Sequence, residues 1–241
     1  MVRIGADIYD FLAPQYQSMR EHRKHYVRAV NERCIENLAN CSTWLDVGSG
    51  DGARVREILE RTGDRKVVCI EPSKAMAHLC LDNVKKGEVL NRYLDQQFST
   101  HYKGRFECVT ALWNVLGHFP TDRDRREFIK NVRNVLGPGG TLLLDVNNRH
   151  NGKAYGVIRA RFRYFRDLLW FRESSGDAVY SVKVGDRTEL CCGHIFTTEE
   201  LLDFFPADDW ARLEVEYIDY QSGEAAKDRF SGQILIRATA L

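Results

Sequence analysis

Three glycines and two aspartates crowd into residues 46–52, a composition that suits ligand binding. The glycines are Gly48, Gly50 and Gly52. Glycine puts no Cβ between the backbone N–H groups of a turn and a ligand. Strand-forming residues at 43–45 precede this stretch, and residues 53–60 carry apolar side chains at helical spacing. The pattern predicts a strand, a glycine-rich turn and a helix, with the turn facing a bound molecule.

Glu71 is the second chemically informative position. It follows a short apolar run at residues 66–70 and lies nineteen residues beyond Gly52. A carboxylate at the end of a second parallel strand can accept hydrogen bonds from both hydroxyls of a ribose. On its own, Glu71 could equally be a favourable charge at a helix N-terminus. Together with the glycine turn, the spacing favours a nucleoside.

The charges beside the turn bear on which nucleoside binds. A dinucleotide fingerprint needs G-x-G-x-x-G spacing and a helix N-terminus left open for a pyrophosphate. Here the glycines occupy every second position, and Asp46 and Asp51 add negative charge. This charge suits a ligand with an ammonium group better, so a nucleotide-dependent oxidoreductase is the less favoured alternative.

Four segments of the chain, in order, resemble the class I S-adenosylmethionine-dependent methyltransferases. They are residues 45–52 (motif I), 71–76 (the acidic segment after the second strand), 106–119 (the fourth strand and its loop) and 135–145 (the fifth strand region). The resemblance implies S-adenosylmethionine as cofactor. It makes Tyr16 a lid residue, for which ordinary helix packing is the alternative, and it places Asp95 and Gln96 against adenine. The cofactor-binding residues it implies are Tyr16, Asp46, Gly48, Gly50, Gly52, Glu71, Pro72, Met76, Asp95, Gln96 and Leu112.

The loop after the fourth strand is most similar to that of small-molecule enzymes of the glycine N-methyltransferase kind. That similarity rests on Asn114 and His118, and on Asp145 at the end of the fifth strand. It implies that His118 is the candidate base and that Asn114 and Asn147 orient the acceptor. A histidine bonded to backbone is the alternative for His118. Those enzymes carry an arginine where this chain has Asn147, which counts against a glycine-like substrate.

These residues need a scaffold, and the resemblance implies an α/β fold: a Rossmann-like, seven-stranded, mostly parallel sheet with helices on both faces and the last strand antiparallel. We expect a single methyltransferase domain over 1–241. Within it, residues 1–40 form an N-terminal helical lid, and residues 149–192 form a small substrate-side insert between strands five and six.

Composition narrows the classes of partner. A net charge of +1 argues against binding nucleic acid through bulk charge. No apolar run is long enough to span a bilayer, and the N-terminus lacks the apolar run of a signal peptide, so we expect a cytoplasmic protein with no membrane partner. The seven cysteines are irregularly spaced, which predicts reduced thiols and no metal site.

Residues 149–172 are basic and aromatic. They hold seven arginines and lysines against one acid, a local charge of 7 − 1 = +6. We favour a lid or substrate pocket here over a subunit contact, and a subunit contact over a nucleic-acid site, since one short patch makes few phosphate contacts. The chain is expected to be a monomer or a homodimer.

The sequence therefore predicts methyl transfer from S-adenosylmethionine to a small-molecule acceptor, at nitrogen. An O-methyltransferase is the first alternative. A nucleotide-dependent oxidoreductase and an RNA-associated binding module are weaker ones. The identity of the acceptor is left open, because the pocket is built from loops.

Overall fold

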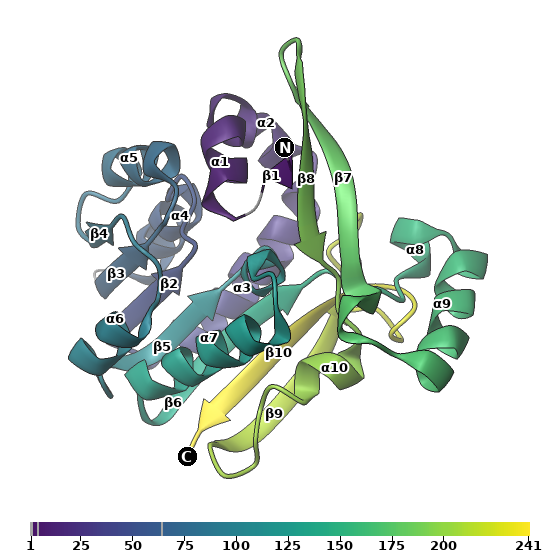
Figure 1. Cartoon of the computed structure of the whole chain (residues 1–241). Helices are drawn as coiled ribbons and strands as arrows, with labels where there is room; N and C mark the ends of the chain where they lie inside the picture. The colour runs from purple at the N-terminus through teal and green to yellow at the C-terminus, as the bar shows by residue number, and fades with distance from the viewer. Residues whose placement is uncertain (1, 4, 64) are drawn as a thin grey trace.

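The computed structural model describes residues 2–3, 5–63 and 65–241 (Figure 1). Residues 1, 4 and 64 of the predicted domain, the first two also in the predicted lid, lie outside the described residues. The strands are β1 (Val2–Arg3), β2 (Thr43–Val47), β3 (Lys66–Ile70), β4 (Glu88–Leu90), β5 (Phe106–Ala111), β6 (Leu136–Val146), β7 (Asp177–Val184), β8 (Arg187–His194), β9 (Trp210–Ile218) and β10 (Gln233–Ala240). The α-helices are α1 (Ala6–Leu12), α2 (Tyr16–Glu21), α3 (Lys24–Leu38), α4 (Ala53–Thr62), α5 (Lys74–Asn83), α6 (Gln96–His101), α7 (Asp122–Val135), α8 (Gly152–Tyr155), α9 (Val157–Trp170) and α10 (Thr198–Leu202). Three 3₁₀ turns, Ala13–Gln15, Val115–His118 and Glu173–Gly176, complete the elements of the described chain.

Seven strands form the central sheet in the order β4-β3-β2-β5-β6-β10-β9. Neighbouring strands from β4 to β6 are parallel, whereas β10 is antiparallel to both β6 and β9. The predicted fold class is confirmed. Val47 at the end of β2 is paired with Ile70 at the end of β3. Gly48 and Glu71, the next residue in each case, therefore emerge side by side at one edge of the sheet.

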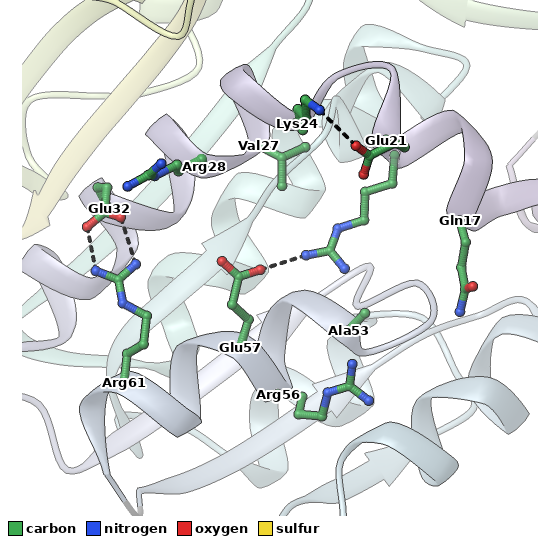
Figure 2. Close-up of a pocket in the computed structure, with 11 residues that line it drawn as sticks. Gln17, Glu21, Lys24, Val27, Arg28, Glu32, Ala53, Arg56, Glu57 and Arg61 are labelled. Atoms are coloured by element: carbon green, nitrogen blue, oxygen red, sulfur yellow. Dashed lines mark hydrogen bonds and ion pairs between the residues drawn. The ribbon is translucent and has the colours of Figure 1, made fainter.

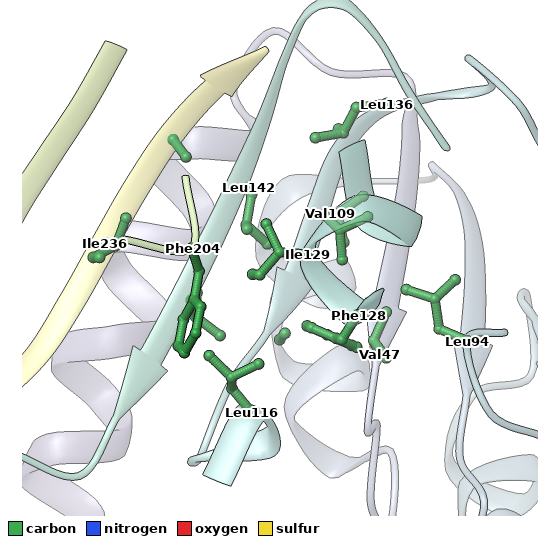
Figure 3. Packing of buried hydrophobic residues seen from close by; sticks show 14 of the residues in the cluster. Val47, Leu94, Val109, Leu116, Phe128, Ile129, Leu136, Leu142, Phe204 and Ile236 are labelled. Carbon is green, nitrogen blue, oxygen red and sulfur yellow. The ribbon is translucent and has the colours of Figure 1, made fainter. Parts of the chain in front are cut away.

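Helices cover both faces of this sheet and bury its apolar side chains. On one face, Val109 and Leu142 of the sheet pack in the same cluster as Phe128 and Ile129 of α7 (Figure 3). The side chain of Thr121 caps α7 by accepting from the Asp124 N–H, which fixes where that helix begins. The rigid sheet thus holds the loops at its edge.

The opposite face carries a second cluster, in which α3 and α4 pack on the sheet. Cys69 and Cys108 are fully buried in it and act there as small hydrophobic side chains. All seven cysteines are free thiols.

The N-terminal segment is less regular than the predicted helical lid over residues 1–40 implies. It breaks into α1, α2 and α3, and the first break falls at the 3₁₀ turn that contains Pro14. Proline lacks an N–H and its ring crowds the preceding turn. At the start of the segment, β1 pairs with β8, and Asp10 of α1 accepts hydrogen bonds from the Ser73 hydroxyl (2.6 Å) and the Ala75 N–H (3.0 Å) at the start of α5.

The region predicted as an insert holds α8, α9 and a hairpin of β7 and β8 outside the central sheet. Val184 pairs with Arg187 across a two-residue turn, Gly185-Asp186, with Gly185 at φ +57°. The hairpin and β1 form a separate three-stranded sheet. Figure 1 shows it standing beside α1 and α2, with α8 and α9 on its outer side.

Candidate active site

The glycine turn after β2 needs glycine at each position. Gly48, Gly50 and Gly52 have φ values of +71°, +58° and +73°, a region that other residues rarely occupy. A Cβ on Gly48 would lie 2.6 Å from Val115 Cγ2, and one on Gly50 would lie 3.1 Å from the Tyr16 hydroxyl oxygen. The turn is therefore shaped so that its backbone, without side chains, faces the space under Tyr16.

Glu71 lies beside this turn with both carboxylate oxygens already oriented. One oxygen accepts from the Gly50 N–H at 2.8 Å and the other from the Ser73 N–H at 2.8 Å. Burial raises the pKa of Glu71 to about 7, although the two backbone hydrogen bonds favour its ionised form. An ionised carboxylate can accept about four hydrogen bonds, so Glu71 retains capacity for two more donors. A ribose offers two hydroxyls.

A cavity of about 210 Å³ lies over the turn and Glu71. Six of the predicted cofactor residues line it: Tyr16, Gly48, Gly50, Glu71, Pro72 and Leu112. The other predicted residues lie outside the lining. Asp46 is buried and accepts from the Thr110 hydroxyl at 2.5 Å, and Met76 is fully buried on α5.

Three further predicted cofactor residues, Gly52, Asp95 and Gln96, also lie outside the cavity lining. Gly52 precedes the first turn of α4 and packs against Cys80. The Asp95 carboxylate caps α6 by accepting from the Phe98 N–H at 2.7 Å, and Gln96 is exposed. The neighbouring Tyr93 and Leu94 line the cavity instead. Contacts of Asp95 and Gln96 with adenine stay predictions.

Two consecutive residues after β5, Trp113 and Asn114, adopt positive φ values of +73° and +63°. Such a conformation is costly for a bulky side chain and persists only when its surroundings hold it. Asp145 supplies that hold, since its carboxylate accepts from the Trp113 N–H and from the Tyr26 hydroxyl (2.5 Å). The side chain of Asn114 in turn accepts from the Asn147 N–H at 3.0 Å. The predicted acceptor residues Asn114 and Asn147 are thus in contact.

His118 follows in the same loop, in the 3₁₀ turn. Its Nε2 lies 2.7 Å from the Tyr9 hydroxyl oxygen, and its Nδ1 is buried without a hydrogen-bond partner among the described residues. Burial lowers the pKa of His118 to about 4. The imidazole is therefore neutral at pH 7, with a free nitrogen.

A second cavity, of about 610 Å³, meets the first at four shared side chains. They are Tyr9, Tyr16, Trp113 and His118. Asn114 and Asn147 line the second cavity, so all three predicted acceptor-side residues border it. We call the first space the nucleoside cavity and the second the acceptor cavity.

Arginines dominate the charge of the acceptor cavity. Arg23, Arg159 and Arg163 line it, and Arg149 lines it while paired with Asp167 at 2.6 Å. The Arg23 guanidinium lies 5.4 Å from the centre of the Trp113 ring and makes no ion pair with any residue that the structure describes. Burial lowers the pKa of Arg23 from its ordinary value. The cavity therefore presents a guanidinium with no direct ion-pair partner in the described chain, although the buried Asp145 lies close enough to interact with it electrostatically.

His194 also borders the acceptor cavity, but its ring is held by two carboxylates. Nδ1 lies 2.8 Å from Asp177 and Nε2 lies 2.7 Å from Glu200. Within the described part of the chain, no three or more His, Cys, Asp or Glu side chains are grouped so as to hold a metal ion.

Another groove, of about 760 Å³, lies between α2, α3 and α4 (Figure 2). Six of its eight charged side chains pair with one another. Arg61 contacts both carboxylate oxygens of Glu32 at 2.7 and 2.8 Å, and Arg20 contacts Glu57 at 2.8 Å. Because these pairs are solvated and mutually satisfied, the groove is a surface ion-pair network rather than a site.

Sequence reasoning missed Tyr9, Arg23 and Trp113 as site residues. Tyr9 and Tyr16 are seven residues apart, a helical spacing that could have marked them as one face. No local signal identifies Arg23 or Trp113, because α3 and the loop after β5 meet only in the folded chain.

Comparisons with known proteins agree with this geometry. A family model described as "Methyltransferase domain" matches residues 19–213. A polyamine aminopropyltransferase of Leptospira biflexa is 33% identical over 78 residues, and that match spans 28% of the relative's length and 29% of this chain.

Solved structures match over nearly the whole chain. A possible histamine N-methyltransferase of Thermotoga maritima matches with a TM-score of 0.63 and 14% identity, covering 97% of this chain and 98% of that one. An amino pentose methyltransferase of Micromonospora echinaspora, bound to S-adenosylmethionine, matches at 0.59 and 19%, covering 94% and 96%. A Burkholderia thailandensis 1,6-didemethyltoxoflavin-N1-methyltransferase matches at 0.60 and 13%, covering 97% and 87%. At these identities the likeness establishes a shared fold.

Proposed function

The chain belongs to the methyltransferase domain family, and on that premise we propose that it transfers a methyl group from S-adenosylmethionine to a small-molecule acceptor, at nitrogen. One observation carries the proposal. The nucleoside cavity and the acceptor cavity share Tyr9, Tyr16, Trp113 and His118, so a cofactor in one and an acceptor in the other would contact the same four side chains.

The residues of the nucleoside cavity fit S-adenosylmethionine. The glycine turn leaves room that a Cβ would fill, and Glu71 can accept two more hydrogen bonds, as a ribose requires. When bound, this cofactor supplies an electrophilic methyl group on a sulfonium. The protein then has to align the acceptor and exclude water, and such positioning can contribute roughly 7–11 kcal/mol.

The low pKa of His118 favours nitrogen as the acceptor atom. An aliphatic alcohol must lose a proton to become a good nucleophile, and a group with a pKa of about 4 is too weak a base to remove it. A neutral amine is already nucleophilic. In the tautomer whose Nε2–H donates to the Tyr9 hydroxyl oxygen, His118 Nδ1 can accept a hydrogen bond from the amine. The neighbours from Thermotoga maritima and Burkholderia thailandensis are also named for nitrogen acceptors.

Replacement of His118 tests this assignment. We expect His118→Ala to lower kcat by about 10- to 100-fold, in line with the loss of a hydrogen-bond acceptor that positions the amine. Wild-type kcat at saturating cofactor should show no step near pH 6.5 from this residue, because His118 gains its proton only toward pH 4. Tyr9→Phe removes the 2.7 Å contact with Nε2 and serves as the partial variant. Unchanged turnover in His118→Ala would remove His118 from the mechanism.

Because Arg23 lines the acceptor cavity, we further expect the acceptor to carry an anionic group. We expect Arg23→Gln to raise KM for a carboxylate-bearing amine at least about tenfold, because a hydrogen-bonded charge pair contributes about 1.5–3 kcal/mol. KM for the matching neutral amine should change little. Arg28→Gln, an exposed change on the same helix, is the control. An equal rise of KM for both amines would show that Arg23 only shapes the cavity.

The proposed function itself is tested by binding and by product analysis. Calorimetry should detect S-adenosylmethionine and S-adenosylhomocysteine but not NAD. With a ¹³C-labelled methyl donor, a panel of amines and matched alcohols should give N-methyl carbon signals. O-methyl products would identify the alternative acceptor atom. Binding of NAD alone would point to an oxidoreductase, and salt-sensitive retention of RNA without cofactor binding would point to an RNA-associated module.

A further inference from the structure

Helix α9 exposes an unusual amount of apolar surface. Of the fourteen large hydrophobic residues that are exposed in the described part of the chain, eight lie within residues 157–171. The most exposed is Ile158, at 88%. Figure 1 places α9 at the periphery, away from the central sheet. This surface is not covered by any described part of the protein.

The exposed side chains of α9 form one stripe. Ile158, Phe162, Phe165 and Leu169 are 63–88% exposed and stand at i, i+4, i+7 and i+11. At 3.6 residues per turn, this spacing puts all four on one side of the helix. We call this stripe the outer face of α9. It runs the length of the helix.

The opposite side of α9 is fixed to the protein. Ala160 is fully buried there, and Asp167 is held by Arg149 at 2.6 Å and by His150 at 3.1 Å. An ion pair this deeply buried fixes the rotation of the helix, because turning α9 would leave charges without partners. The outer face is therefore directed to solvent by the fold.

Positive charge borders the outer face on both sides. Arg161 and Arg166 are exposed and flank the stripe by helical spacing, with Arg166 also contacting Asp167 at 3.3 Å, and the exposed Arg172 follows the helix. Asp167, the acid of the helix, is turned inward and paired. Trp170 is 69% exposed at the C-terminal end. The surface thus combines an apolar stripe, flanking arginines and a tryptophan.

We propose that the outer face of α9 docks the protein on an anionic lipid surface. An amphipathic helix with arginines along an apolar stripe lies in the plane of a bilayer, and each arginine near anionic headgroups adds attraction. Arginine stems can extend along the stripe while their guanidinium groups reach the phosphates. Charge decides against a second copy of the chain, because an α9–α9 contact about a two-fold axis would bring like charges together.

This proposal departs from the expectation, drawn from composition, of no membrane partner. It concerns adsorption at the surface only: none of the described helices has the length and hydropathy needed to cross a bilayer. Arg159 and Arg163, on the flank of the same helix, line the acceptor cavity. Docking would therefore bring that cavity close to the lipid surface.

Vesicle co-sedimentation of the whole 241-residue chain tests the proposal. Vesicles of phosphatidylcholine alone are compared with vesicles of equal parts phosphatidylcholine and phosphatidylglycerol, at low and high salt. We expect binding to the anionic vesicles only, weakened by salt. Phe162→Ser with Leu169→Ser should lower the partition coefficient at least about tenfold, since two large apolar side chains are withdrawn from the interface. Arg161→Glu should lower it as well.

Controls separate docking from unfolding. Leu81→Ser removes an apolar side chain that is 52% exposed on α5 and should leave vesicle binding unchanged. Tryptophan emission should shift to the blue on anionic vesicles, and Trp170→Phe should abolish most of that shift while retaining co-sedimentation. The proposal is overturned by absent binding, by equal binding to neutral vesicles, or by a dimer that the Phe162/Leu169 double variant dissociates while vesicle binding is absent.

Discussion

Glu71→Gln is expected to weaken S-adenosylhomocysteine binding about 100-fold, since it removes the charge from two hydrogen bonds worth roughly 1.5–3 kcal/mol each. The same residue should give wild-type binding its pH dependence. Its pKa is raised to about 7 by burial, and only the ionised carboxylate accepts from both ribose hydroxyls. Affinity should therefore rise with pH through 7, by about tenfold from pH 6 to pH 8. Titration calorimetry over that range measures both effects, and the dependence should vanish in Glu71→Gln.

Glu107→Gln is the matched control for this result. Glu107 also accepts from two backbone N–H groups, those of Ser42 (2.5 Å) and Thr43 (3.0 Å), but it lies at the start of β5, at the opposite end of the sheet from Glu71. Glu107→Gln should leave both the affinity for S-adenosylhomocysteine and the pH dependence of that affinity unchanged. If Glu71→Gln bound S-adenosylhomocysteine as tightly as wild type, the ribose contact would be wrong, whereas methyl transfer by another binding mode would remain open.

Gly52→Ala is expected to lower the melting temperature by roughly 5–15 °C, which corresponds to about 2–4 kcal/mol in a chain of this size. Two costs add. A non-glycine residue at φ +73° costs about 1–2 kcal/mol. The new Cβ would also lie 2.8 Å from Cys80 Sγ and 3.0 Å from Cys80 Cα, so α4 and α5 would have to separate.

Gly104→Ala isolates the first of these costs. Gly104 has φ +66°, and nothing lies within 4 Å of where its Cβ would be. Gly104→Ala should lower the free energy of unfolding by only about 1 kcal/mol, the cost of the backbone conformation alone. Thermal unfolding followed by circular dichroism compares the two variants. Equal losses would mean that the packing of α4 on α5 tolerates the methyl group, and that Gly52 is required only for its φ.

The sequence predicts the sheet and its glycine turn well because both are local patterns. Glycines at alternate positions predict the turn from the local sequence alone. The apolar run before Glu71 predicts a strand, and in a parallel sheet the residue after that strand lies at the sheet edge. The hairpin of β7 and β8 is also predictable from a local pattern. Gly185-Asp186 is a two-residue turn between two strand-forming runs, a recognised hairpin signal.

The acceptor cavity was less predictable because its walls meet only in the folded state. Trp113 gains a positive φ through Asp145 and Tyr26, which lie far from it in sequence. The direction of α9 depends on Asp167 reaching Arg149, so the arginines that line the cavity and those that face solvent could not be separated from composition. The family resemblance places Asp95 against adenine, yet this residue also fits the pattern of a helix cap.

The attachment of the N-terminal segment has a consequence for how ligands are exchanged. Three contacts hold it beside the nucleoside cavity: the pairing of β1 with β8, the hydrogen bonds of Asp10 at the start of α5, and the packing of Ile8 and Leu12 with Cys191 of β8. Opening of this segment would break these contacts while the central sheet and the two clusters on its faces stay intact, so the rate of ligand exchange and the stability of the sheet can vary independently.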